Sequence, residues 1–235
     1  MLHCKIADLI VAVPTAGGMS PRCKKYFVCE EKPDITIDAS KYRYHVWPAA
    51  SEDGVAYMES GLQFYTNLLR YNGLMLHSSA VEYKGKAYLF SGPCGVGKST
   101  HTRLWQQTFG PAAQIINDDK PALRFLNQRW YAYGTPWCGK DGINQNKKVP
   151  LAGICFLKQS DSNSIRQLTD KEATQSIIAQ TTYRLRDVKY VDLMLQNVER
   201  LVQYIPVFEL KNRPDTDAVQ LSYETMSRMA EEMNL

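Results

Sequence analysis

The sequence lacks several features that would each define a class of protein. No run of apolar residues is long enough to cross a bilayer as a helix, so no membrane-spanning segment is predicted. The six cysteines include no C-x-x-C pair, which argues against a structural zinc site. The net charge is only +4, too small to indicate a nucleic-acid-binding protein, and there is no internal repeat. What is present is a globular composition with 44% hydrophobic and 22% charged residues.

The first residues also lack the pattern of an export signal. The apolar stretch MLHCKIADLIVAV is interrupted by Asp8, and it has neither a basic segment before it nor a small-residue cleavage site after it. We therefore expect a cytoplasmic protein with reduced thiols, and we expect neither membrane nor nucleic acid among its partners.

Residues 1–73 are predicted to form an N-terminal accessory α+β region. β-Branched and aromatic residues predict strands within 5–13 and within 34–47, with a loop between them. A helix is expected to begin at the capping residue Ser51 and to stop at Gly73, with its apolar face packed on a core.

Residues 74–235 are predicted to form the catalytic domain. Strands are expected at 74–83, 87–92, 113–118, 121–126, 129–134, 149–158, 164–169 and 205–212, and helices at about 98–108, 170–180, 187–204 and 215–229. This alternation, with a hairpin turn at Asn127-Gln128, is typical of an α/β domain with a mixed sheet. The strand at 149–158 is strongly apolar, which favours burial on both of its faces.

The strongest motif is a glycine-rich segment between a strand and a helix. Residues 92–99, GPCGVGKS, fit the pattern G-x-x-x-x-G-K-[ST]. Glycines allow positive φ angles, so successive backbone N–H groups can converge on one point, and the following helix adds its N-terminal amides. The pattern predicts a P-loop (Walker A) that binds ATP, with the Lys98 ammonium near the β- and γ-phosphates and the Ser99 hydroxyl on Mg²⁺.

The whole loop is expected to contact the nucleotide. Its residues are Gly92, Pro93, Cys94, Gly95, Val96, Gly97, Lys98, Ser99 and Thr100. The alternative is a glycine-rich turn that only packs tightly, and a lysine and a serine at this fixed offset are not needed for packing.

An acidic pair follows the next apolar strand. Asp118 and Asp119 end the segment IINDD, and ligands of α/β sheets bind at the C-terminal edge of the strands. One carboxylate is expected to bind Mg²⁺ and the other to take a proton from an attacking hydroxyl, and the sequence does not assign the two roles. The alternative is that one aspartate only caps the turn toward Lys120.

These segments together resemble a known family. LHSSAVEYKGKAYLFSGPCGVGKST at 76–100 and IINDDKPALRF at 115–125 resemble the catalytic domain of HPr kinase/phosphorylase, which is related to the phosphoenolpyruvate carboxykinase fold. The resemblance implies ATP-dependent transfer of a phosphoryl group to a hydroxyl, often that of a serine. It also implies an active site made of His77, Lys98, Ser99, Asp118 and Asp119. Without the resemblance, His77 would be interpreted as a core histidine.

The segment at 133–148, YGTPWCGKDGINQNKK, is a long polar loop between two strands, and loops of this length are often functional. Trp137 is a candidate to stack on a substrate, and Lys140 is a candidate catalytic cation for a transferring phosphoryl group. Lys147 and Lys148 are candidates to attract an acidic partner. The alternative is a solvated loop with Trp137 packed into the core.

The combined prediction is a kinase similar to HPr kinase, with ATP and Mg²⁺ as cofactors. Its acceptor is either a serine of a protein or peptide or a small-molecule alcohol, and a homo-oligomer is one of the possible assemblies. Two alternatives stay open: a module that senses ATP without turnover, and carboxykinase-like chemistry on a small acid. The second alternative would need further cationic and metal-binding residues, which the sequence does not locate.

Overall fold

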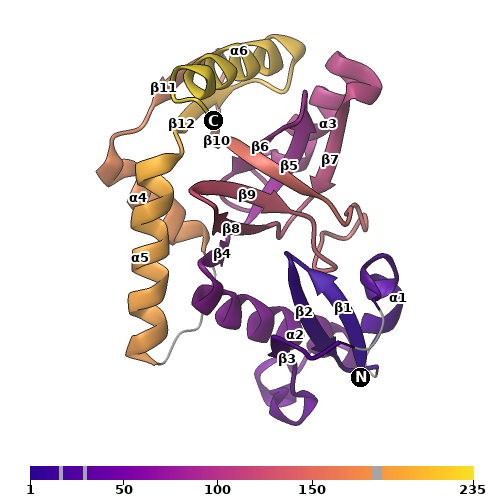
Figure 1. Cartoon of the computed structure of the whole chain (residues 1–235). Coiled ribbons are helices and arrows are strands. Elements are labelled where there is room, and N and C mark those ends of the chain that lie inside the picture. Colours follow the sequence, from indigo (N-terminus) through magenta and orange to yellow (C-terminus); the bar gives the residue numbers. More distant parts are fainter. Residues whose placement is uncertain (16–17, 29–30, 182–186) are drawn as a thin grey trace.

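The chain forms a mixed α/β structure with a nine-stranded sheet and a three-stranded sheet (Figure 1). The computed structural model describes residues 1–235 except 16–17, 29–30 and 182–186. The larger sheet contains β4 (Gly73–Met75), β5 (Ser78–Tyr83), β6 (Lys86–Ser91), β7 (Ala113–Asn117), β8 (Ala122–Leu126), β9 (Arg129–Tyr133), β10 (Lys148–Gln159), β11 (Ser164–Gln167) and β12 (Val207–Asn212). Its strand order is β4-β8-β9-β10-β6-β5-β7, with β12 paired to both β10 and β11. Parallel and antiparallel pairs occur together, which confirms the predicted α/β class with a mixed sheet.

The middle of the larger sheet is buried on both faces. The long helices that pack on it are α3 (Lys98–Phe109), α4 (Asp170–Gln180), α5 (Val188–Tyr204) and α6 (Thr216–Glu232). In β6, Ala87 and Leu89 belong to one apolar core with α4 and α5, and Tyr88 and Phe90 belong to another with α3 and α6. β10 alternates in the same way, which confirms its expected burial on both faces.

The single strand predicted at 74–83 is wrong, because the chain forms two shorter strands there. β4 pairs with β8, whereas β5 pairs with β6 and β7. His77 lies between the two strands, and its N–H donates to the carbonyl of Gln180 at the end of α4, with a distance of 3.0 Å. The partner of this amide is a helix residue and not a neighbouring strand. His77 is thus fixed at the point where the chain passes from β4 to β5.

Most other elements of the second region are confirmed to within about two residues. β8 and β9 form the expected hairpin, with Asn127 and Gln128 at φ angles of 50° and 61°. Asp187 and Asp215 each cap the helix that follows, and the side chain of Asp215 accepts a hydrogen bond from Ala218 N.

The N-terminal region differs most from its prediction. The expected strand at 5–13 is a hairpin of β1 (Leu2–Ile6) and β2 (Leu9–Val13), because Ala7 and Asp8 adopt positive φ angles and reverse the chain. Within 34–47, only Ile35–Thr36 pairs as a strand, β3. Two short 3₁₀ turns, Ala39–Lys41 and Tyr44–Val46, follow it, although the residues have strand propensity. A short helix, α1 (Met19–Cys23), lies where a loop was expected.

Helix α2 (Glu52–Leu68) connects this region to the larger sheet. Ser51 caps it as predicted, and the turn is completed by Asn72 in the left-handed conformation rather than by Gly73. Gly73 instead begins β4, where a Cβ atom would lie 2.7 Å from the carbonyl oxygen of Leu123, so only glycine lets β4 approach β8 this closely.

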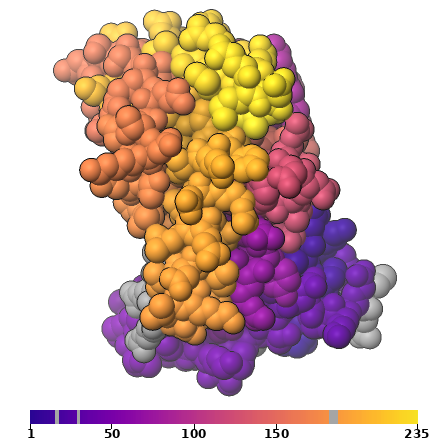
Figure 2. Space-filling view, turned by 60° about the vertical axis from the view of Figure 1, so that its left-hand side comes forward, coloured from indigo at the N-terminus to yellow at the C-terminus, as the bar shows by residue number. Residues whose placement is uncertain are grey.

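The N-terminal sheet and α2 pack at one end of the larger sheet (Figure 1). Their apolar core includes Ala122, Tyr133 and Trp137 from the second region. On another side, Asn197 of α5 donates to the carbonyls of Leu69 and Gly73, and Figure 2 shows α5 lying against the purple residues of the first region. Among the described residues, none of the helices combines the length and apolarity that a bilayer crossing requires.

Candidate functional site

The glycine-rich loop runs from the end of β6 to the start of α3. Gly92, Gly95 and Gly97 have φ angles of 140°, 82° and 109°, which side chains with a Cβ rarely adopt. Gly97 is the N-cap of α3, and in the described part of the chain no side-chain hydrogen bond caps this helix end. The first amides of α3 therefore face outward as donors, with the positive end of the helix dipole behind them. This arrangement fits an anion.

The Lys98 side chain folds back over the loop. Its Nζ donates to the carbonyl oxygens of Gly92 and Pro93, at 2.9 and 3.2 Å. Burial lowers the pKa of Lys98, and the charge of Asp119 acts in the opposite direction. The ammonium is thus held at the centre of the loop, close to the first turn of α3.

The acidic pair lies in a turn that is set by Asn117, the last residue of β7. The fully buried Asn117 side chain accepts hydrogen bonds from the backbone N–H groups of Asp119 and Lys120, at 2.9 and 2.8 Å. It also donates to the carbonyls of Thr135 and Trp137. Because every polar atom of this amide is used, the direction of the turn is fixed.

The two carboxylates of the pair have opposite environments. Asp118 is buried, and burial raises its pKa. Its Oδ1 accepts a hydrogen bond from Gly139 N at 2.6 Å, which lowers the pKa by less than burial raises it. Asp119 Oδ1 lies 3.0 Å from His77 Nε2, and its Oδ2 contacts Lys120 Nζ. Burial alone would raise the pKa of Asp119, but the contacts with His77 and Lys120 outweigh it and lower this pKa to about 2.

Most of the predicted site residues line one cleft of about 480 Å³. Its lining residues are His77, Cys94, Gly95, Gly97, Lys98, Ser99, Thr100, Arg103, Asp118, Asp119, Gly139, Lys140 and Asp141. The loop, the acidic pair, His77 and Lys140 therefore come together although they are far apart in the sequence. Gly92, Pro93 and Val96 do not line this cleft and instead line pockets on other sides of the loop.

Three residues of the cleft were not predicted. Arg103 of α3 pairs with Asp141 across it, and Gly139 supplies the amide that binds Asp118. Asp141 and Gly139 flank the predicted Lys140, so their position in the same loop was a usable signal. No local pattern marked Arg103, because its contact joins residues 38 positions apart.

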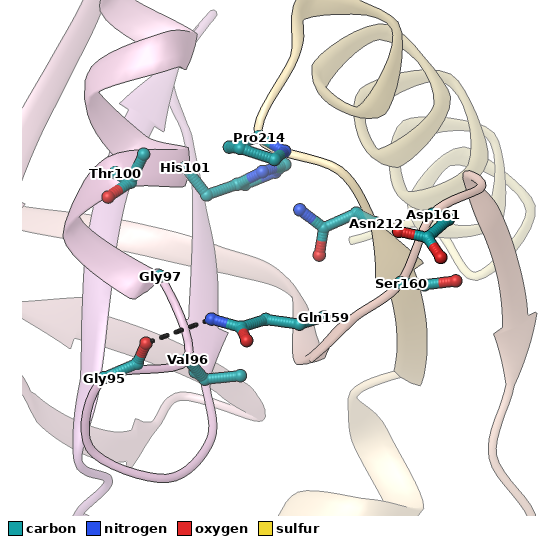
Figure 3. A pocket seen from close by; sticks show the side chains of 10 residues that line it. All are labelled: Gly95, Val96, Gly97, Thr100, His101, Gln159, Ser160, Asp161, Asn212 and Pro214. Atoms are coloured by element: carbon teal, nitrogen blue, oxygen red, sulfur yellow. Dashed lines mark hydrogen bonds between the residues drawn. The ribbon is translucent and has the colours of Figure 1, made fainter.

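Two further pockets flank the loop. One of about 560 Å³ is lined by Gly95, Val96, Gly97, Thr100, His101, Gln159, Ser160, Asp161, Asn212 and Pro214 (Figure 3). The other, of about 690 Å³, lies between the loop, the end of β10 and α4. The first shares Gly95, Gly97 and Thr100 with the cleft, so the two spaces adjoin across the start of α3.

His101 lies at the inner side of the pocket in Figure 3. It is buried, and burial lowers its pKa to about 4. Its Nε2 lies 3.2 Å from Trp105 Nε1 and 3.3 Å from Ser222 Oγ. Its Nδ1 has no hydrogen-bond partner among the described residues.

The long loop at 133–148 does not use all of its candidates as predicted. Trp137 is fully buried, its ring stacks on Phe64 with 4.7 Å between centroids, and its Nε1 donates to Ser60 Oγ. The alternative with a packed tryptophan is therefore correct, and stacking of an exposed Trp137 on a substrate is wrong. Lys147 and Lys148 form internal ion pairs with Glu82 and Asp8.

The oxygen atoms of the cleft suit Mg²⁺ better than a transition metal. In the described part of the chain, no three His, Cys, Asp or Glu side chains are grouped to hold a metal ion. Ser99 and the carboxylates of Asp118 and Asp119 line the same cleft. Mg²⁺ commonly takes one or two carboxylates and completes its shell with water and phosphate oxygens, so this donor set fits it.

The fold and the site define a class of mixed α/β protein with an uncapped glycine-rich strand–loop–helix opposite an acidic pair. Residues 52–214 match the family described as SynChlorMet cassette protein ScmC. This match covers more than half of the chain, and the chain therefore belongs to the ScmC family.

Two other similarities are more distant. The chain is 26% identical over 144 residues to "Multidrug resistance protein 1" of Plasmodium falciparum, in isolates FC27 / Papua New Guinea and 3D7. The match covers 61% of this chain, which spans about a tenth of the length of these relatives. The Hpr(Ser) kinase/phosphatase from Coxiella burnetii covers 66% of this chain and 97% of its own, with 11% identity and a TM-score of 0.37. These last values are too low to transfer the fold or the activity of that protein.

Proposed function

We propose that the protein is an ATP-dependent phosphotransferase that moves the γ-phosphoryl group to a hydroxyl. One observation carries the proposal: the uncapped start of α3 and Lys98 share a cleft with two aspartates of opposite environment. A protein that only binds ATP would need the loop and one carboxylate for Mg²⁺. The presence of both Asp118 and Asp119 in the cleft leaves one carboxylate for proton transfer from an acceptor.

ATP would lie with its phosphates on the loop and its nucleoside in the pocket of Figure 3. That pocket adjoins the cleft at Gly97 and Thr100. The side-chain amides of Gln159 and Asn212 line it, and such amides can pair with the N6 and N7 edge of adenine.

The environments of the two aspartates favour one assignment of their roles. Asp118 has a raised pKa and would be the base that takes the proton of the acceptor hydroxyl. The acceptor oxygen then bonds to the γ-phosphorus as the bond to the leaving ADP breaks. Asp119 stays ionised and, with Ser99, would hold Mg²⁺, which neutralises phosphate charge when bound. His77 and Lys120 keep the Asp119 carboxylate in place.

Cations complete the site. Lys98 would leave the carbonyls of Gly92 and Pro93 to contact the β- and γ-phosphates. Lys140 lines the cleft opposite the loop and would stabilise the charge of the transferring group.

The test is mass spectrometry of products formed from γ-¹⁸O-labelled ATP, Mg²⁺ and a cell extract. We expect a labelled phosphoester with the wild type and at least about a thousandfold less with Lys98→Ala, since the variant loses the cation at the phosphates. Lys171→Ala, an exposed lysine of α4, is the matched control and should behave as wild type. Equal labelling by Lys98→Ala would refute the proposal, and tight ATP binding with no labelled acceptor would favour a sensor.

A further inference from the structure

An apolar pocket of about 260 Å³ lies beside the cleft, and the proposed chemistry does not use it. It is lined by Trp47, Tyr57, Met58, Gly61, Leu62, Tyr65, Met75, Lys120 and Trp137. Of these residues, Trp137 is buried, and Met58 and Leu62 of α2 are partly exposed. Most of the lining residues that the structure describes are aromatic or aliphatic, so this part of the pocket favours an apolar group over a phosphate or a sugar.

Two short stretches of chain connect this pocket to the reacting end of the cleft. Lys120 lines the pocket, and its ammonium contacts the carboxylate of the preceding Asp119. Trp137 lines the pocket, and Gly139, two residues later, binds Asp118 through its amide. Two residues of extended chain span at most about 7 Å. The Cα atom of Lys120, which lines the pocket, therefore lies no farther than this from the Cα atom of Asp118, the proposed base.

Tyr57 also connects the two spaces. Its ring lines the pocket, and its hydroxyl donates to the carbonyl of Cys138 at 2.7 Å. Burial raises the pKa of Tyr57, and the negative charge of Asp119 adds to this effect. The pocket wall at Tyr57 is thus bonded to Cys138, whose neighbour Gly139 binds Asp118.

The size of the pocket decides what kind of group it takes. Sites for whole small molecules are commonly about 300–1,000 Å³, larger than this one. A single tryptophan, phenylalanine or leucine side chain fits such a volume better. Its burial among aromatic rings would add binding energy remote from the reacting hydroxyl.

We propose that the acceptor is a polypeptide, and that this pocket binds an aromatic or large aliphatic side chain within two residues of the phosphorylated serine. The inference rests on the proposed phosphotransferase function and gives that function its acceptor class. The hydroxyl lies at Asp118, the neighbouring apolar side chain lies among Tyr57, Met58 and Leu62, and the backbone between them passes Lys120.

The experiment compares serine decapeptides that carry either tryptophan or alanine at one position from −3 to +3. Transfer is measured as kcat/KM with ATP and Mg²⁺, and peptide affinity by fluorescence polarisation. Leu62→Trp fills the pocket from the helix, and Met58→Trp is a second filling variant in case the first unfolds. Asn67→Trp, on the same helix but outside the lining, is the matched control.

We expect tryptophan within two positions of the serine to raise kcat/KM at least about tenfold over alanine. The filling variants should remove this preference, with ATP affinity unchanged, and Asn67→Trp should retain it. The inference is overturned if no peptide is bound or phosphorylated, if tryptophan and alanine peptides react equally, or if a folded filling variant keeps the preference.

The same data separate this inference from the proposed function. Transfer to extract components that depends on Lys98, without any tryptophan preference among peptides, would refute only the acceptor pocket. Absence of any Lys98-dependent transfer would refute the phosphotransferase itself.

Discussion

The two walls of the cleft are built in different ways. The loop wall is local: residues 92–99 are consecutive, and its shape comes from three positive φ angles and the start of one helix. The opposite wall is assembled from a distance, since Asn117 joins the turn at Asp118-Asp119 to Thr135 and Trp137. A local wall suits the binding of phosphates common to all nucleotides, whereas an assembled wall can be changed to suit one acceptor.

The largest expected effect comes from breaking the assembled wall. Asn117→Ala leaves the buried carbonyl of Thr135 and two turn amides without this partner, at about 1–3 kcal/mol each before relaxation, whereas the carbonyl of Trp137 keeps its bond from the Thr135 hydroxyl. We expect the free energy of unfolding to fall by at least about 3 kcal/mol and phosphoryl transfer to fall about a hundredfold. Urea unfolding and single-turnover rates measure both, and a variant with unchanged values would show that the turn is fixed by other contacts.

A pH-dependent change of similar size in the free energy of unfolding is expected from His101, in the helix that follows the loop. His101 has a pKa of about 4 when folded and about 6.5 when unfolded, so protonation favours the unfolded chain. Its contribution is complete above pH 6.5 and is lost as the pH falls toward 4, amounting to about 3 kcal/mol. The stability gap between wild type and His101→Gln should shrink by this amount between pH 7 and 4.

The exposed His45 provides the comparison for this measurement. His45→Gln is the matched control for replacing a histidine by glutamine at an exposed position. Parallel curves for wild type and His101→Gln would mean that the imidazole is not held neutral in the folded protein.

The smallest expected effect on stability comes from the loop wall itself. Gly97→Ala forces a Cβ at a φ angle of 109°, although nothing lies within 4 Å of that atom. We expect a cost of about 1–3 kcal/mol from backbone strain alone. ATP affinity should fall at least about tenfold, because the amides at the start of α3 move. Calorimetric titration with ATP checks this, and unchanged affinity would show that the loop does not hold the phosphates.

The sequence predicted the two walls unequally, for the same physical reason. The loop and the start of α3 follow from local backbone preferences, and the position of the acidic pair follows from the end of one apolar strand. The role of Asn117 and the amide of Gly139 depend on contacts between residues about 20 positions apart, which no short pattern encodes.

Two wrong predictions have a related cause. The segment 74–83 has continuous strand propensity, but its two halves pair with different partners and the chain breaks at His77. Residues 34–47 have aromatic and β-branched character, yet only two of them find a partner strand and the rest form turns.

The most direct test of the account separates binding from chemistry at Asp118. ATP affinity and the single-turnover transfer rate are measured for wild type and Asp118→Asn, the latter removing the base while keeping the side-chain size. The account predicts an ATP dissociation constant within about threefold of wild type and a rate lower by about 10²–10⁴-fold. It also predicts that the wild-type rate falls as the pH is lowered through a pKa above the usual value of an aspartate. The reason is that burial raises the pKa of Asp118, and the base is inactive when it is protonated. An Asp118→Asn variant that transfers phosphate at the wild-type rate would contradict the account.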